Sequence, residues 1–274
     1  MIGVIIGDCS GSFREFTRKE KFPNLPLMPS DRDVRITDDT LLSIATAKAL
    51  IEADGDWDEV NFAKWYKIIG KEYFESVGGF GGRFREWVSK EEIDHSYHSF
   101  GNGSAMRVSP VAYVAESFEE LMHLATKSAM VTHNHPEGIK GAQATAYMVW
   151  LARQGHSIHK IIEMCRDVGL YYEPLRYLGK FDNACQETMR LVTYVLLNTE
   201  SFEEAMKAAV TIPYSDADTI GAIVGSIAGE LYDIPIELET QALGYVASYP
   251  SLMAIIHEFV DFISERNENG KEEK

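Results

Sequence analysis

Two short acidic segments, far apart in the sequence, carry the residue types best suited to chemistry. The first is Thr37–Thr40, with the sequence TDDT, and the second is Ser215–Thr219, with the sequence SDADT. One Asp or Thr is enough to cap a helix, at a gain of about 1 kcal/mol. Each segment holds two carboxylates and two hydroxyls, and like charges repel each other unless a cation lies between them. The segments therefore predict either ordinary helix caps or a shared cation site.

Three glycines, Gly221, Gly225 and Gly229, follow the second acidic segment at intervals of four residues, on one face of an expected helix. Each glycine inside a helix costs about 1 kcal/mol relative to alanine, so the spacing indicates close approach of another backbone. Membrane helices pair through the same spacing, but this run is short and charged residues flank it. We therefore expect a central helix that holds its acidic N-terminus rigidly. Oxygen ligands without a nearby cysteine favour Mg²⁺ or Mn²⁺ over zinc.

Two further segments contain residues typical of binding sites. Phe100–Arg107 includes the turn Gly101–Gly103, whose backbone N–H groups could line an anion, although a simple tight turn is the ordinary alternative. Residues 132–136, with the sequence THNHP, contain His133, but no third soft ligand lies nearby for zinc. A histidine at a helix end is more often a cap or a packing residue than a metal ligand. We expect His133 to line a binding site.

Helical periodicity dominates the remaining elements and predicts an all-α fold. Ser117–Glu120 and Ser201–Glu204 have the capping-box pattern that opens a helix. Residues 1–6 form an apolar run that fits a strand or a buried helix equally well. Irregular structure is expected over 17–36 and 78–103, and the last residues form a polar tail. We predict one domain over 1–265 and a frayed tail over 266–274. Further helices are expected over 41–53, 57–73, 137–153, 157–168, 183–197 and 252–265.

The composition of the chain restricts its partners. The sequence has 26 Lys and Arg against 42 Asp and Glu, a formal net charge of −16. Such a chain is a poor non-specific binder of nucleic acids or anionic membranes, and a site for an anionic substrate would need local positive charge. Three cysteines without metal-type spacing favour a reducing compartment. With no signal peptide or membrane-spanning run evident, we expect a cytoplasmic monomer that binds neither nucleic acid nor membrane.

Taken together, five motifs resemble those of the ADP-ribosylglycohydrolase family, which includes the dinitrogenase reductase-activating glycohydrolases and the ADP-ribosylhydrolases of animals. In chain order the motifs are Gly7–Glu15, Thr37–Thr40, Gly101–Arg107, Thr132–Pro136 and Asp216–Ile223. The resemblance implies a single-domain, all-α orthogonal helical bundle that holds two divalent cations, Mg²⁺ or Mn²⁺, in a cleft.

The resemblance also implies roles for residues at matching positions. The implied metal ligands are Thr37, Asp38, Asp39, Asp216, Asp218 and Thr219. The carboxylates implied to act in catalysis are Asp38, Asp39, Asp218 and Glu15, the last of them near the metals. Contacts to the substrate are implied for Ser99, Gly101, Asn102, Gly103 and His133, and the glycine loop Gly79–Gly82 is a candidate second cradle.

The reaction implied by the resemblance is hydrolysis of the glycosidic bond between ADP-ribose and a protein side chain. Divalent cations would polarise the anomeric centre, and carboxylates would orient the attacking water and take its proton. The implied partner is therefore an ADP-ribosylated protein or an ADP-ribose derivative. The second metal motif departs from the usual Gly-Gly-Asp start, because Tyr214 and Ser215 precede Asp216, and Ala217 replaces the usual Thr. Since the Asp-x-Asp-Thr pattern is intact, we expect metal binding to be retained.

Two other functions agree with the sequence. One is a non-hydrolytic ADP-ribose-binding or crystallin-like protein, which the crowded carboxylates disfavour. The other is a metal-dependent nucleotide phosphohydrolase, which would release phosphate and no free ADP-ribose. The linked side chain and the choice between Mg²⁺ and Mn²⁺ stay open at this point.

Overall fold

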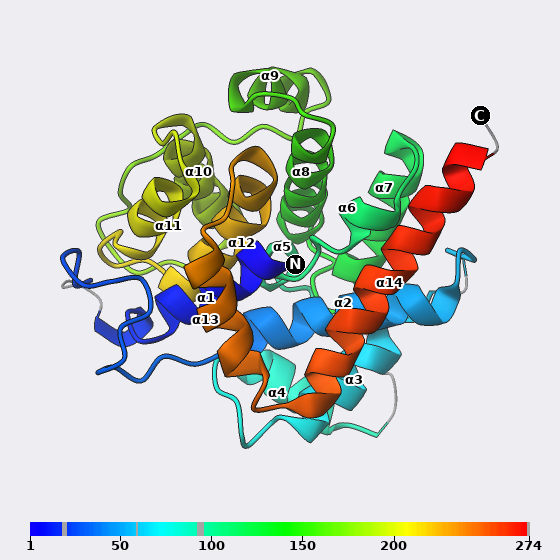
Figure 1. Cartoon of the computed structure of the whole chain (residues 1–274), viewed down its shortest axis with the longest axis horizontal. Helices are drawn as coiled ribbons and strands as arrows, with labels where there is room; N and C mark the ends of the chain where they lie inside the picture. The colour runs from blue at the N-terminus through cyan, green and yellow to red at the C-terminus, as the bar shows by residue number, and fades with distance from the viewer. Residues whose placement is uncertain (18–20, 59, 92–95, 273–274) are drawn as a thin grey trace.

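The computed structural model describes residues 1–17, 21–58, 60–91 and 96–272, and within them it contains helices and no β-sheet (Figure 1). The all-α prediction is confirmed. The only β-type pairings in these ranges are two isolated bridges, Thr37 with Gly78 and Gly101 with Ala184. The elements in order are α1 (Ile2–Ser12), η1 (Glu15–Thr17), α2 (Asp38–Ala53), α3 (Phe62–Glu72), α4 (Gly82–Ser89), α5 (Gly103–Met106), α6 (Val111–Val114), α7 (Phe118–Met130), α8 (Pro136–Arg153), α9 (Ile158–Asp167), α10 (Cys185–Leu197), α11 (Phe202–Val210), α12 (Ala217–Leu231), α13 (Ile236–Val246) and α14 (Pro250–Glu272).

Helices α1 and α12 pack backbone to backbone in the middle of the molecule (Figure 1). A Cβ atom added to Gly7 would lie 1.9 Å from the carbonyl oxygen of Gly221, and one on Gly225 would lie 2.0 Å from that of Gly3. A Cβ on Gly11 would lie 2.3 Å from the Cα of Asp218. The expected close approach to the α12 glycines is therefore present. It brings α1 against the acidic start of α12.

The N-terminal run that fitted a strand or a buried helix forms α1, and every residue of α1 except Ile2 is buried. A helix enclosed on all sides has no polar face, so its sequence carries no helical periodicity. At both predicted capping boxes, Ser117 and Ser201 accept hydrogen bonds from the backbone N–H groups of Glu120 and Glu204. The two Glu side chains accept in return from the N–H of the residue before each cap, Glu116 and Glu200. These caps begin α7 and α11, as expected.

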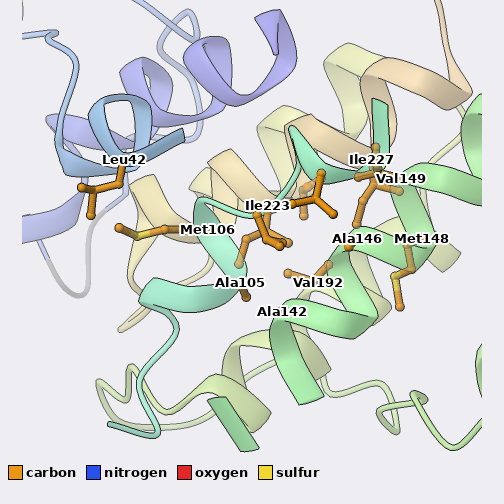
Figure 2. Packing of buried hydrophobic residues seen from close by; sticks show 14 of the residues in the cluster. Leu42, Ala105, Met106, Ala142, Ala146, Met148, Val149, Val192, Ile223 and Ile227 are labelled. Carbon is orange, nitrogen blue, oxygen red and sulfur yellow. The ribbon is translucent and has the colours of Figure 1, made fainter. Parts of the chain in front are cut away.

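The core is one cluster of apolar side chains shared by the inner helices. Figure 2 shows part of it, where side chains from α2, α5, α8, α10 and α12 meet. Alanines such as Ala142 and Ala146 on α8 let neighbouring helices approach closely. This packing fixes the N-terminal ends of α2 and α12 relative to each other, and both ends carry an acidic segment.

Of the two segments predicted to be irregular, 17–36 and 78–103, the second contains a helix. The loop before α2 is held to α1 by the buried side chain of Arg14, whose guanidinium donates hydrogen bonds to the carbonyl oxygens of Ser10, Lys21, Pro26 and Leu27. The second stretch was expected to be irregular throughout, which is wrong for residues 82–89, because they form α4. This helix buries Phe84, Trp87 and Val88, and its apolar side chains contact Gly70 of α3.

The C-terminal segment expected as a frayed tail continues α14 as helix up to Glu272. Arg266 donates a hydrogen bond to Glu116 and lies over the ring of Trp57, so contacts with two other parts of the chain hold this end of the helix. Residues 273 and 274 of the expected tail lie outside the described residues. Across the described part of the chain, no helix is long and apolar enough to cross a membrane.

Candidate functional site

A cleft of about 380 Å³ opens where α2 and α12 begin. It brings together residues that are up to about two hundred positions apart in sequence, and every residue predicted for the site lines it except Thr37, which is buried directly beneath. The lining includes Glu15, Asp38, Asp39, Ser99, Gly101, Asn102, Gly103, His133, Asp216, Asp218 and Thr219. The fold therefore gathers the two acidic segments and the two middle motifs into one site.

Asp8 of α1 is a carboxylate of this site that sequence reasoning did not assign. Its side chain is fully buried and accepts hydrogen bonds from the backbone N–H and hydroxyl groups of both Thr37 and Thr40. Asp8 thus caps the N-terminus of α2 from a different helix, where a negative charge also complements the helix dipole. A charged residue inside the apolar run from Val4 to Cys9 was the signal that could have found it.

Loss of these four acceptor contacts is expected to be costly. We expect Asp8→Ala to lower the free energy of unfolding by about 3 kcal/mol, because buried donors at the start of α2 lose their acceptor. Asp8→Asn is the matched control, since its amide oxygen can still accept from the backbone of α2. Differential scanning calorimetry in EDTA measures both. Equal losses of stability for the two variants would contradict this role of Asp8.

Three buried carboxylates, Asp8, Asp39 and Asp218, place one oxygen atom each within 4.8 Å of one another. The Thr219 hydroxyl donates to Asp39 Oδ2 at 3.4 Å, and the Thr37 hydroxyl oxygen lies 3.1 Å from the same atom while its proton is directed to Asp8 at 2.8 Å. The other oxygen, Asp39 Oδ1, is buried and has no hydrogen-bond partner. A buried carboxylate oxygen without a donor is strongly unfavourable unless a cation faces it.

A second group of three carboxylates, Glu15, Asp216 and Asp218, meets the same distance criterion, so Asp218 belongs to both groups. Asp216 accepts a hydrogen bond of 2.9 Å from the Asn102 side-chain amide. The Lys21 ammonium lies beside this group and donates to the carbonyl oxygens of Arg14, Glu15 and Ser215. It therefore ties the segment that carries Glu15 to the turn that carries Asp216.

Asp38 belongs to neither group of described carboxylates, although it lines the cleft and the charges of Asp8 and Asp216 act on it. Gly79 leaves room for it, since a Cβ at that position would lie 2.0 Å from Asp38 Oδ1, and the φ of +102° also suits glycine. Gly81 and Gly82, by contrast, have open space beside them and line the cleft. The glycine loop thus makes room for Asp38 on one side and borders the cleft on the other.

The pKa is raised for every carboxyl in the two groups for which a shift is resolved. Burial is the main cause for Asp8, Asp39 and Asp218, and neighbouring carboxylates add to the increase in the pKa of Asp39 and Asp218. Burial and then Asp216 raise the pKa of Glu15 to about 7, against an ordinary value of 4.5. So many acids held close together favour either protons or bound cations.

The donor set fits divalent hard cations. It contains carboxylate and hydroxyl oxygens, and no cysteine or histidine belongs to either group of described residues. Oxygen-only donor sets are typical of Mg²⁺, Ca²⁺ and Mn²⁺ rather than zinc. Such ions would bind between the carboxylates of the two groups, where the unpartnered oxygen of Asp39 is available as a ligand.

The raised pKa values predict how pH affects the metal-free protein. A group whose pKa is higher in the folded than in the unfolded chain stabilises the fold fully below its unfolded pKa. For Glu15 that stability is lost as the pH rises from 4.5 through about 7. We expect the melting temperature in EDTA to fall over this interval, and added Mn²⁺ to raise it more at the higher pH, because cations and protons compete. A melting temperature in EDTA that rises with pH would contradict this.

Residues of the two middle motifs line the same cleft as the acidic groups, and Gly101 and Gly103 lie beside the ring of His133. The backbone N–H of Gly101 donates to the Ser99 hydroxyl, and that of Asn102 donates to the carbonyl oxygen of Asn183. These two N–H groups, proposed above as part of an anion cradle, are thus already engaged within the protein. His133 is largely buried beside the turn and lines the cleft, and burial followed by the charge of Arg107 lowers the pKa of its imidazole well below the ordinary range.

Comparison with known proteins gives consistent similarities. A family model described as ADP-ribosylglycohydrolase matches residues 1–268. The chain is 27% identical to the ADP-ribosyl-dinitrogen reductase glycohydrolase of Rhodospirillum rubrum, covering 85% of each chain. It is 24% identical to an ADP-ribosylhydrolase of Homo sapiens, covering 89% of this chain and 88% of the human protein.

Two further comparisons concern a bacterial relative and a solved structure. The chain is 22% identical to an ADP-ribosylarginine hydrolase of Pseudomonas putida, covering 85% of this chain and 70% of that protein. A solved structure titled ADP-ribosylglycohydrolase-related protein complex superposes with a TM-score of 0.68 at 23% identity, covering 89% of this chain and 94% of the other. At that identity the superposition supports the fold alone.

Proposed function

As the chain belongs to the ADP-ribosylglycohydrolase family, we propose that its acidic cleft hydrolyses the glycosidic bond between ADP-ribose and a modified protein side chain, with two bound divalent cations. The observation that carries this proposal is the meeting of two carboxylate groups through Asp218, with Asp39 Oδ1 buried and unpartnered. A protein that only bound ADP-ribose would have no need for so many crowded acids.

We assign the metal-holding role to the most deeply buried oxygens. Asp39 and Asp218 are 1% and 3% exposed, so they are too enclosed to reach a substrate without an intervening ion. Asp216 and Glu15 complete the second group, and the Thr37 and Thr219 hydroxyls lie beside Asp39. When bound, divalent cations would supply Lewis-acid polarisation of ribose oxygens and a positive field for the pyrophosphate.

The half-buried carboxylates suit proton transfer better than the enclosed ones. Glu15 and Asp38 line the cleft and keep some exposure to it, so they can reach a water molecule there. Burial and Asp216 raise the pKa of Glu15 to about 7 without metal, and cations bound beside it would favour the charged carboxylate that accepts a proton. We assign Glu15 and Asp38 to orient the attacking water and accept its proton.

The substrate itself is assigned to the opposite wall of the cleft. Ser99, the Gly101–Gly103 turn and His133 line it, together with aromatic side chains such as Phe100 and Phe181. Asn102 donates to Asp216, which joins this wall to the acidic groups. The arrangement would place the ribose between the carboxylates and the turn.

The experiment that tests this function measures free ADP-ribose released from arginine-linked and serine-linked ADP-ribosylated proteins. Each substrate is assayed with Mg²⁺, with Mn²⁺ and with EDTA. We expect release that depends on the metal, and the substrate cleaved identifies the linkage. ADP-ribose binding without release would indicate a binding protein, and phosphate release without ADP-ribose would indicate a phosphohydrolase; either result would overturn the proposal.

A further inference from the structure

We propose that Arg107 and Thr132 act through a chain of hydrogen bonds to hold His133 in one neutral tautomer, with its Nε2–H group directed into the cleft as a donor to bound substrate. Arg107 and Thr132 are thus positioning residues, and His133 is the residue that contacts the ligand. The part of this inference that concerns the ligand rests on the function proposed above. The part that concerns the tautomer does not.

The chain starts at a fully buried guanidinium. Arg107 donates from Nη2 to the Thr132 hydroxyl oxygen at 2.8 Å and to the carbonyl oxygen of Ser128 at 3.1 Å. Arginine is a donor only, so the Thr132 oxygen must be the acceptor of that bond. The single proton of the Thr132 hydroxyl therefore remains available for another acceptor. His133 Nδ1 lies 2.7 Å from the same hydroxyl oxygen.

The charge of Arg107 determines whether the Thr132 hydroxyl donates to His133 Nδ1 or accepts from it. Its guanidinium lies over the ring of Tyr66, and Nε and Nη1 have no hydrogen-bond partner, so the charge is only partly compensated. An unprotonated Nδ1 turns the negative end of the imidazole toward this cation, whereas a protonated Nδ1 would turn the positive end toward it. Thr132 therefore donates to Nδ1, and the ring proton resides on Nε2.

A competing acceptor for the Thr132 proton is the phenol oxygen of Tyr97, which also lies within hydrogen-bonding reach of Thr132. If Thr132 donated there, His133 Nδ1 would have to carry the proton and face Arg107. Burial disfavours a charged ring, and the cation that disfavours that tautomer adds to this effect. A neutral ring with its proton on Nε2 lets Arg107 donate to the Thr132 oxygen while Thr132 donates to His133 Nδ1.

The Nε2 edge of His133 faces the turn that lines the cleft. A Cβ on Gly103 would lie 3.1 Å from Nε2, and one on Gly101 would lie 3.7 Å from it. The N–H groups of Gly101 and Asn102 are engaged by the protein, so this imidazole N–H adds a donor beside them. The acceptor it suits is a phosphate or ribose oxygen of ADP-ribose.

The tautomer can be measured directly on the ligand-free protein. Nuclear magnetic resonance of the ¹⁵N-histidine-labelled chain distinguishes a protonated from an unprotonated ring nitrogen by its shift and its couplings to the ring protons, and His133→Asn identifies the signal. We expect Nε2–H in the wild type and in Thr132→Ser, and a mixture or the other tautomer in Thr132→Val. A wild-type ring protonated on Nδ1, or a Thr132→Val spectrum identical to wild type, would overturn the proposal.

Binding of ADP-ribose, measured by calorimetry at fixed Mg²⁺, tests the donor. Loss of one hydrogen bond is expected to weaken binding roughly fivefold. We expect this weaker binding of ADP-ribose for Thr132→Val and His133→Asn. Affinity close to that of the wild type is expected for Thr132→Ser, which keeps the hydroxyl, and for His133→Gln, whose amide nitrogen lies near the Nε2 position. Equal affinity for His133→Gln and His133→Asn would overturn the donor role. If ADP-ribose release fails while the wild-type ring is protonated on Nε2, the proposed function fails and the tautomer stands.

Discussion

Replacing Asp218 by asparagine is expected to abolish ADP-ribose release while making the metal-free protein more stable. Asp218 belongs to both carboxylate groups, so the neutral amide removes a ligand charge from each. Loss of a metal ligand should weaken Mn²⁺ binding by at least about 100-fold, because replacing a residue that only hydrogen-bonds to a ligand already weakens metal binding by about 10- to 100-fold. Burial, Asp216 and Asp39 raise the pKa of Asp218, which means that its charged form is unfavourable without a cation.

The two opposite effects separate this explanation from simple misfolding. In EDTA, the melting temperature of Asp218→Asn should lie above that of the wild type, because a repelling charge is gone and the amide oxygen can still accept from the Thr219 N–H. Added Mn²⁺ should raise the wild-type value and leave the variant unchanged. Asp167→Asn, at the exposed end of α9, is the control. Activity retained in Asp218→Asn would remove the basis of the proposed function.

The second large effect is expected at the contact between α1 and α12. In Gly225→Ala the new methyl group would lie 2.0 Å from the carbonyl oxygen of Gly3, which is backbone and cannot rotate away. The helices must separate, and overpacking of this kind costs about 3 kcal/mol, occasionally more. Because α1 carries Asp8 and α12 carries Asp218, separation should also weaken Mn²⁺ binding.

The neighbouring glycine of the same stripe provides the matched control. In Gly229→Ala the nearest atom to the methyl group is Ile234 Cδ1 at 3.1 Å, the end of a flexible side chain. That change also gains about 1 kcal/mol of helix propensity, so stability should remain within about 1 kcal/mol of wild type. Chemical denaturation of both variants measures the difference. Equal stability of Gly225→Ala and Gly229→Ala would show that close backbone approach does not explain the spacing.

The sequence predicted features that depend on local chemistry. Capping boxes at Ser117 and Ser201 are local patterns, and both begin helices in the structure. The glycine spacing of α12 correctly indicated a close backbone neighbour. That neighbour, α1, was not identified, because a helix buried on all sides has no amphipathic pattern to distinguish it from a strand.

The site was harder to predict where it depends on distant contacts. Asp8 acts on the start of α2 across 29 residues; its charge within an apolar run marks it as unusual, but the sequence does not show which helix it will cap. The turn at Gly101 suggested free N–H donors, but its partners Ser99 and Asn183 are known only once the chain is folded. The link from Arg107 through Thr132 to His133 likewise depends on side-chain placement.

The central claim is that the cleft works through two divalent cations held by the acidic groups. The measurement that tests it most directly counts Mn²⁺ bound per chain by electron paramagnetic resonance while ADP-ribose release is followed in the same samples. We expect two bound ions per chain, with release that rises as the sites fill and returns to zero in EDTA. Full release from protein that contains no divalent metal would contradict it.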